Sequence, residues 1–257
     1  MDDNIELFKS TSYLEEMMLM ENEALSTGLS INEYLKNKGY KIKNVLDIPC
    51  GLGRLSIEMS KFGYNVTGID ISTQFLSVAK SKSYNENMVK KIDFIEADMY
   101  NDNLGELIGE NSDLILNWWT SIGYKNQSDD LKFLKNLHKI SHHGTIFMLQ
   151  IWHRTFILSH PIKRTWKELK NGYVLIEYNI SNFNSLVESK RKYYKLNNNL
   201  LTYEGEYNTK VLLYDLADLA QMLKKTGWGV VDIMNDIRNP APFNPNNNGL
   251  VIVSKSL

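Results

Sequence analysis

The spacing of hydrophobic and polar positions changes twice along the chain. Over the first forty residues apolar side chains recur at helical spacing, and Ser-x-x-Glu capping patterns at Ser12 and Ser30 predict helices over 12–24 and 30–37. From Val45 onward, short apolar strands alternate with helical stretches, which is typical of a parallel sheet with helices on both faces. The predicted strands are 43–47, 64–69, 92–96, 113–117 and 144–152, and the helices between them are 53–61, 72–83, 103–109 and 128–140.

A different pattern follows residue 154. A helix is predicted over 161–169, and runs of β-branched and aromatic residues then predict an antiparallel meander. The meander strands are 173–180, 186–196 and 201–213, and the last elements are a helix over 215–225 and strands over 228–234 and 250–254. We therefore expect one α/β domain over 1–257, with a helical lid over 1–40 and an inserted, substrate-side antiparallel subdomain over 154–213.

Residues 44–80, NVLDIPCGLGRLSIEMSKFGYNVTGIDISTQFLSVAK, hold the most specific chemistry of the chain. An acid ends each of two successive predicted strands, Asp47 and Asp70, and a turn with Gly51 and Gly53 follows the first acid. A carboxylate just before such a turn repels a nucleotide pyrophosphate and attracts a ligand that carries an ammonium group and a sulfonium. S-adenosylmethionine is a ligand of this kind.

Four stretches of the chain resemble, in the right order, the motifs of a class I S-adenosylmethionine-dependent methyltransferase. They are VLDIPCGLGR, VTGIDIS, DFIEADMY and DLILNWWTSIGY, and the turn resembles the PCGxGR type of a branch of small-molecule enzymes. The resemblance covers the chain from about residue 40 to its end. It implies a Rossmann-like, seven-stranded, mostly parallel sheet, S-adenosyl-L-methionine as cofactor and S-adenosyl-L-homocysteine as product. It further implies in-line transfer of a methyl group to a nitrogen or oxygen of a small molecule.

The expected cofactor site lies on the loops that follow the first four predicted strands. Asp47 would hold the methionine ammonium, directly or through water, and Asp70 the ribose hydroxyls, since Ser72 can cap the next helix. The family usually has glycine where Pro49 stands, and proline there removes one N–H and stiffens the turn. Asp98 would accept a hydrogen bond from the adenine amino group. The full expected set is Asp47, Pro49, Cys50, Gly51, Gly53, Arg54, Asp70, Ile71, Asp98, Met99, Asn117 and Trp118.

Tyr13, Trp119, Tyr124 and His153 are the candidate substrate-binding residues, and the last two are also the candidates for catalysis. His153 could take a proton from a hydroxyl or ammonium, although histidines at strand ends also occur as packed residues. Tyr124 could orient a nucleophile, but a reference pKa of about 10 makes tyrosine a poor base at neutral pH. Because the sulfonium already activates the methyl group, alignment of the two reactants can suffice without a base.

Charge and cysteine content limit the function further. The chain has 29 lysine and arginine residues and 30 aspartate and glutamate residues, so its formal net charge is -1. A charge this close to zero argues against tight non-specific binding to nucleic acid. Cys50 is the single cysteine, which excludes an intrachain disulfide and fits a reducing, cytoplasmic location. No metal site and no membrane span are predicted, and the expected partner is a small-molecule methyl acceptor. The basic run 190–192 lies in a predicted strand and is interpreted as a solvated face.

Other functions stay open at this point. An RNA or protein methyltransferase could use the same core, although the near-neutral charge and the NWWT motif argue against it. The pattern Gly51-x-Gly53-x-x-Ser56 also loosely resembles the glycine turn of a nicotinamide-dependent oxidoreductase. Asp47 argues against that function, because its carboxylate would repel the diphosphate of the cofactor. A non-catalytic subunit that binds S-adenosylmethionine is a further alternative, and the oligomeric state is left open.

Overall fold

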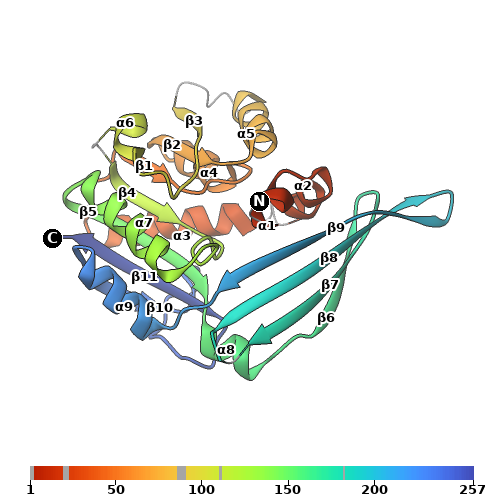
Figure 1. Ribbon diagram of the computed structural model, residues 1–257. Helices are drawn as coiled ribbons and strands as arrows, with labels where there is room; N and C mark the ends of the chain where they lie inside the picture. The colour runs from red at the N-terminus through yellow and green to blue at the C-terminus, as the bar shows by residue number, and fades with distance from the viewer. Residues whose placement is uncertain (1–2, 20–22, 86–90, 110–111, 182) are drawn as a thin grey trace.

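A computed structural model describes residues 3–19, 23–85, 91–109, 112–181 and 183–257. Its main strands are β1 (Asn44–Asp47), β2 (Asn65–Asp70), β3 (Ile92–Glu96), β4 (Ser112–Asn117), β5 (Ser141–Trp152), β10 (Trp228–Met234) and β11 (Gly249–Ser256). Within the described ranges they form one seven-stranded sheet in the order β10-β11-β5-β4-β1-β2-β3 (Figure 1). The pairs from β5 to β3 are parallel, and β11 is antiparallel to both neighbours. The predicted Rossmann-like, mostly parallel sheet is confirmed.

The strand order reverses at β1, and this reversal fixes where a ligand can bind. Strand β1 pairs with β2 on one side and with β4 on the other, so the connections after β1 and after β3 leave in opposite directions. In open parallel sheets, ligands occupy the crevice beyond the carboxyl ends of the strands at such a reversal. The residues that end β1, β2 and β4 therefore face the expected site.

Both faces of this sheet are apolar, because successive residues of a strand point to opposite faces. In β4, Leu114 and Leu116 join one buried cluster and Ile115 joins the other. Helices on both faces complete the two clusters and hold the strand ends in place. They are α3 (Glu23–Asn37), α4 (Arg54–Lys61) and α5 (Thr73–Asn85) on the first face, and α6 (Leu104–Ile108), α7 (Gln127–Lys139) and α9 (Leu216–Lys225) on the second.

The N-terminal segment differs from its prediction. It contains α1 (Asp3–Phe8), α2 (Thr11–Met18) and the continuous helix α3. Both predicted capping positions are wrong, because Ser12 and Ser30 lie inside helices. Ser10 is the residue before α2, and its side chain accepts a hydrogen bond from the backbone N–H of Tyr13. The cap of α2 therefore stands two residues upstream of the predicted position.

The inserted sheet has one strand more than predicted. The segment expected as a helix over 161–169 instead holds the end of a loop and β6 (Arg164–Leu169), preceded by α8 (Arg154–Ser159). Alternate residues of β6 differ in burial, as in a strand with one covered face, and pairing with the next strand stabilises it. The sheet order is β6-β7-β8-β9, with β7 (Gly172–Ser181), β8 (Leu186–Asn197) and β9 (Leu200–Leu212), all antiparallel.

The two sheets lean apart, and α1 and α2 fill the angle between them (Figure 1). Helix α1 contacts β9, while α2 contacts both α5 and β6. The N-terminal helices therefore close the space between the carboxyl ends of the parallel strands and the inserted sheet. Within the described residues, none of the helices combines the length and the apolar character needed to cross a bilayer.

Candidate active site

A cavity of about 500 Å³ lies beyond the carboxyl ends of β1, β2 and β4. Residues that follow these strands form its floor, and α1, α2, α8 and one face of the four-stranded sheet form its walls. Nine of the twelve expected cofactor residues line it. They are Pro49, Cys50, Gly51, Arg54, Asp70, Ile71, Asp98, Met99 and Trp118.

The glycine turn leaves bare backbone facing the cavity. Gly51 and Gly53 have φ angles of 53° and 68°, a left-handed conformation that favours glycine. A Cβ atom on Gly53 would lie 2.8 Å from side-chain atoms of Ala79 and Phe94, so this glycine lets the turn close onto the core. A Cβ atom on Gly51 would meet nothing within 4 Å. The backbone at Gly51 can therefore be approached closely by a ligand.

Asp70 reaches the cavity from the end of β2. Its Oδ2 accepts a hydrogen bond from the N–H of Gly51 at 2.8 Å, and its Oδ1 accepts one from the N–H of Ser72 at 2.9 Å. Burial raises the pKa of the carboxyl group to about 6, although these backbone hydrogen bonds oppose the shift. Ser72 accepts a hydrogen bond from the N–H of Phe75 and so caps α5, as the sequence indicated. Asp70 thus joins the turn to the cavity instead of capping the helix.

Three expected cofactor residues do not line the cavity: Asp47, Gly53 and Asn117. Asp47 is buried, and Ser56 donates a hydrogen bond to its Oδ2 at 2.6 Å. Burial raises the pKa of Asp47 to about 7. Asn117 donates from its side chain to the carbonyl of Ile48 at 2.7 Å and so ties β4 to the turn. Their direct contact with a cofactor stays a prediction.

The backbone after β4 adopts a left-handed conformation that is not predicted from the sequence. Trp119 and Thr120 have φ angles of 57° and 58°, a region that costs a non-glycine residue about 1–3 kcal/mol. Gln150 on β5 holds them, because its side chain accepts a hydrogen bond from the N–H of Trp119 and its carbonyl one from the N–H of Thr120. The indole ring of Trp119 then stacks against Arg54, with the guanidinium carbon 4.0 Å from the ring centroid.

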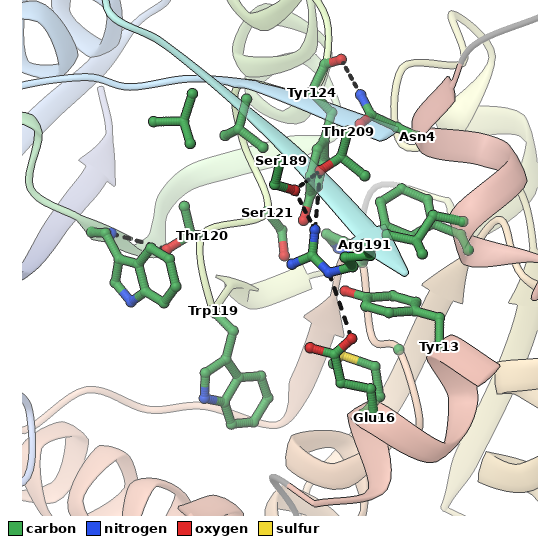
Figure 2. A pocket seen from close by; sticks show the side chains of 18 of the residues that line it. Asn4, Tyr13, Glu16, Trp119, Thr120, Ser121, Tyr124, Ser189, Arg191 and Thr209 are labelled. Atoms are coloured by element: carbon green, nitrogen blue, oxygen red, sulfur yellow. Dashed lines mark hydrogen bonds and ion pairs between the residues drawn. The ribbon is translucent and has the colours of Figure 1, made fainter. Parts of the chain in front are cut away.

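The two candidates for catalysis occupy different places. Tyr124 and Tyr13 both line the cavity, and Asn4 of α1 donates a hydrogen bond to the carbonyl of Tyr124 (Figure 2). Burial raises the pKa of Tyr124 to about 12. His153 does not line the cavity; it is buried, its Nε2 lies 3.0 Å from Asp215, and burial lowers its pKa. Its position does not favour the predicted catalytic role.

Two residues that were not predicted from the sequence as part of the site, His160 and Arg191, also line the cavity. His160, at the end of α8, is the one of the five histidines that lines it. Arg191 lines it as well, so the interpretation of the basic run as a solvated face is wrong for this residue. Lys190 and Lys192 lie on the opposite face of β8, where both pair with Glu206. The sequence contains a signal for this difference, because successive side chains of a strand point to opposite faces of the sheet. Arg191 must therefore point away from the face of Lys190 and Lys192.

The fold and this site together define a class of protein. A parallel sheet with a reversal of strand order, a glycine turn after β1 and an acid at the end of β2 is the arrangement typical of proteins that bind a nucleoside cofactor. Among the described residues, no group of three or more His, Cys, Asp and Glu side chains is arranged to hold a metal ion.

Comparison with known proteins gives the same class. Residues 45–144 match a family model described as a methyltransferase domain. A putative methyltransferase of Geobacillus sp. (strain WCH70) is 20% identical over 241 residues, which are 91% of this chain and 94% of that protein. An S-adenosylmethionine-dependent methyltransferase from Clostridium acetobutylicum ATCC 824 has a similar structure, with a TM-score of 0.78, 17% identity, and 91% and 92% of the two chains covered. The sugar N-methyltransferase KedS8 from Streptoalloteichus sp ATCC 53650 has a TM-score of 0.67, 12% identity, and 90% and 87% coverage.

These findings together indicate an S-adenosylmethionine-dependent methyltransferase, with its methyltransferase domain over residues 45–144. Its residues fit that cofactor: the backbone at Gly51 is open to the cavity, and the carboxylate of Asp70 stands beside it. The likeness to solved structures concerns the fold alone.

Proposed function

We propose that this enzyme methylates a nitrogen or oxygen of a small molecule, as a member of the branch with a PCGxGR turn. The observation that carries the proposal is the cavity of about 500 Å³ between the parallel sheet, α1, α2 and the inserted sheet. Sites for small ligands commonly measure roughly 300–1,000 Å³. The structural likeness to a sugar N-methyltransferase supports the same acceptor class. A cytoplasmic location stays a prediction.

The residues of the chain would hold and align the reactants. S-adenosylmethionine supplies a methyl group that its sulfonium has already activated. Asp70 would accept hydrogen bonds from the ribose hydroxyls, Asp98 and Met99 would hold the adenine, and Asp47 would act on the ammonium group through water from behind the turn. Trp118 would lie near the sulfonium. Alignment and exclusion of water can supply about 7–11 kcal/mol of barrier lowering in such reactions.

The N-terminal helices would act as the lid over this site. The side-chain amide of Asn4 donates a hydrogen bond to the carbonyl of Lys210 on β9 at 3.1 Å and accepts one from its N–H at 3.0 Å. The amide thus pairs with β9 as the backbone of a neighbouring strand would. The hydroxyl of Ser72 donates to the carbonyl of Phe8 at 2.8 Å. These contacts join α1 to both the inserted sheet and the cofactor side. Exchange of cofactor would require them to open, since the helices cover the cavity.

The acceptor class can be tested with S-adenosylmethionine labelled in its methyl group. The enzyme is incubated in parallel with a metabolite extract of molecules below about 1 kDa, with bulk tRNA and with total protein. We expect label in the small-molecule fraction, because the acceptor must enter a cavity of about 500 Å³. Label in RNA or protein would overturn the proposal, and absence of S-adenosylhomocysteine formation with every fraction would favour a non-catalytic subunit. A heat-denatured sample is the control.

Replacing Tyr124 with phenylalanine is expected to lower kcat less than about tenfold on the acceptor so found. A group whose pKa lies at about 12 stays protonated at neutral pH and cannot act as a base. Loss of a true general base would cost about 10²–10⁴-fold. Steady-state kinetics over pH 6–9 measure this. A loss above a hundredfold in kcat with unchanged KM would contradict the expectation.

A further inference from the structure

Arg191 is the cation that β8 presents to the acceptor side of the cavity. Its Nη1 donates hydrogen bonds to the hydroxyls of Ser189 and of Thr209, the latter at 3.2 Å. Its Nε lies 3.5 Å from Oε2 of Glu16 on α2. Figure 2 shows the guanidinium reaching from the sheet toward Glu16 and Tyr13. Nη2 makes no hydrogen bond to any residue in the described part of the chain, so the guanidinium is fixed on one side and available on the other.

The charges around Arg191 leave a local excess of one positive charge. Glu16 has its shorter ion pair with Lys167, at 2.7 Å, and it also accepts a hydrogen bond from Tyr193 at 2.7 Å. Two cations therefore share one carboxylate. The other acids that line the cavity, among the described residues, are Asp70 and Asp98 at the ends of β2 and β3, on the cofactor side.

The surroundings of this charge are mainly apolar or aromatic. Leu7, Tyr13, Tyr178, Ile180 and Val187 all line the cavity, and the ring centroid of Tyr13 lies 5.9 Å from the guanidinium carbon of Arg191. A guanidinium in such a place attracts an anion more strongly than one in water, because the medium screens the charge less. An arginine also offers its donors in a planar fork that matches a carboxylate.

We propose that the methyl acceptor is a small organic acid whose carboxylate binds to Nη2 of Arg191, while its nitrogen or oxygen nucleophile faces the cofactor. This inference rests on the proposed function and adds the substrate class. A single excess positive charge matches a monoanion. A phosphate monoester carries a charge of about −1.5 to −2 and would leave part of it unbalanced here.

The test compares carboxylates with the amides of the same shape. The probes are benzoate with benzamide and phenylacetate with phenylacetamide, titrated calorimetrically into the full-length enzyme saturated with S-adenosylhomocysteine. We expect at least one acid to bind at least tenfold more tightly than its amide. In Arg191→Gln this preference should disappear, while the affinity for S-adenosylhomocysteine changes less than twofold.

Two further variants separate ligand binding from a purely structural role. Lys192→Gln makes the same change of charge one residue away, on the opposite face of β8, and should leave the preference for the acid unchanged. Glu16→Gln removes the acid that Arg191 shares with Lys167 and should keep or increase the preference. If Arg191 only holds α2 through Glu16, then Glu16→Gln should instead lose as much binding as Arg191→Gln.

The outcomes distinguish this inference from the proposed function. Equal binding of each acid and its amide, or a preference that persists in Arg191→Gln, overturns the assignment of Arg191 but not small-molecule methylation. Transfer of labelled methyl groups to RNA or protein overturns the proposed function itself.

Discussion

Asp70→Ala is expected to weaken the binding of S-adenosylhomocysteine at least tenfold. The carboxylate of Asp70 accepts hydrogen bonds from the N–H groups of Gly51 and Ser72 and stands at the cavity. Its removal takes away the proposed acceptor of the ribose hydroxyls and also loosens the glycine turn that the ligand approaches. A hydrogen bond to a charged group contributes about 1.5–3 kcal/mol, and about 1.4 kcal/mol corresponds to a factor of ten in affinity.

Isothermal titration calorimetry measures this loss, with circular dichroism to establish that the variant is folded. Asp70→Asn keeps the shape and one acceptor oxygen, so it should bind with intermediate affinity. Asp102→Ala is the matched control, because Asp102 is an exposed acid that pairs with Lys132 and does not line the cavity. Equal affinity of Asp70→Ala and the wild type would mean that another group holds the ribose.

The sequence predicts the parallel sheet and the floor of the cavity because their signals are local. An apolar strand, an acid and a glycine turn follow one another within a few residues, and Ser72 stands where the helix cap is needed. The sheet reversal then brings the ends of β1, β2 and β4 together by topology alone. No contact between distant segments has to be known for this part of the site.

The acceptor side could not be predicted in the same way, because it depends on contacts between distant elements. Glu16 meets Arg191 and Lys167 only after α2 has packed against the inserted sheet. The left-handed backbone at Trp119 likewise depends on Gln150, more than thirty residues further along the chain. His153 follows β5 in sequence, but it pairs with Asp215 and does not line the cavity.

The stability of the cofactor-free enzyme is expected to decrease as the pH rises from 5 to 8. Burial raises the pKa of Asp47 to about 7 and that of Asp70 to about 6, whereas an aspartate in the unfolded chain has a pKa near 3.9. Between about pH 4 and these raised values, the folded state keeps protons that the unfolded state has lost. The contribution of these two carboxyl groups to the free energy of unfolding therefore falls as the pH rises through this range, and it levels off above about pH 8. The lowered pKa of His153 acts in the opposite direction, but only below its unfolded value of about 6.5.

A bound cofactor should reduce this loss. The ammonium group of S-adenosylhomocysteine favours the ionised form of Asp47, so the ligand binds more tightly where that carboxyl group has already lost its proton. The increase in Tm caused by the ligand should then be larger at pH 7.5 than at pH 5. The opposite order would mean that the ammonium group does not act on Asp47.

Thermal unfolding of the enzyme at pH 5, 6, 7 and 8, with and without ligand, measures both effects. Without ligand, Tm should fall by several degrees over this range, and Asp47→Asn should flatten the fall because an amide carries no titrating proton. Asp236→Asn is the control: burial raises the pKa of Asp236, but its hydrogen bonds and the charge of Arg238 bring it below the usual value. Asp236 is then charged in both states above pH 5, so its replacement should shift Tm equally at every pH. An unchanged slope in Asp47→Asn would place the source of the pH dependence elsewhere, because only a proton held in the folded state and lost on unfolding can produce it.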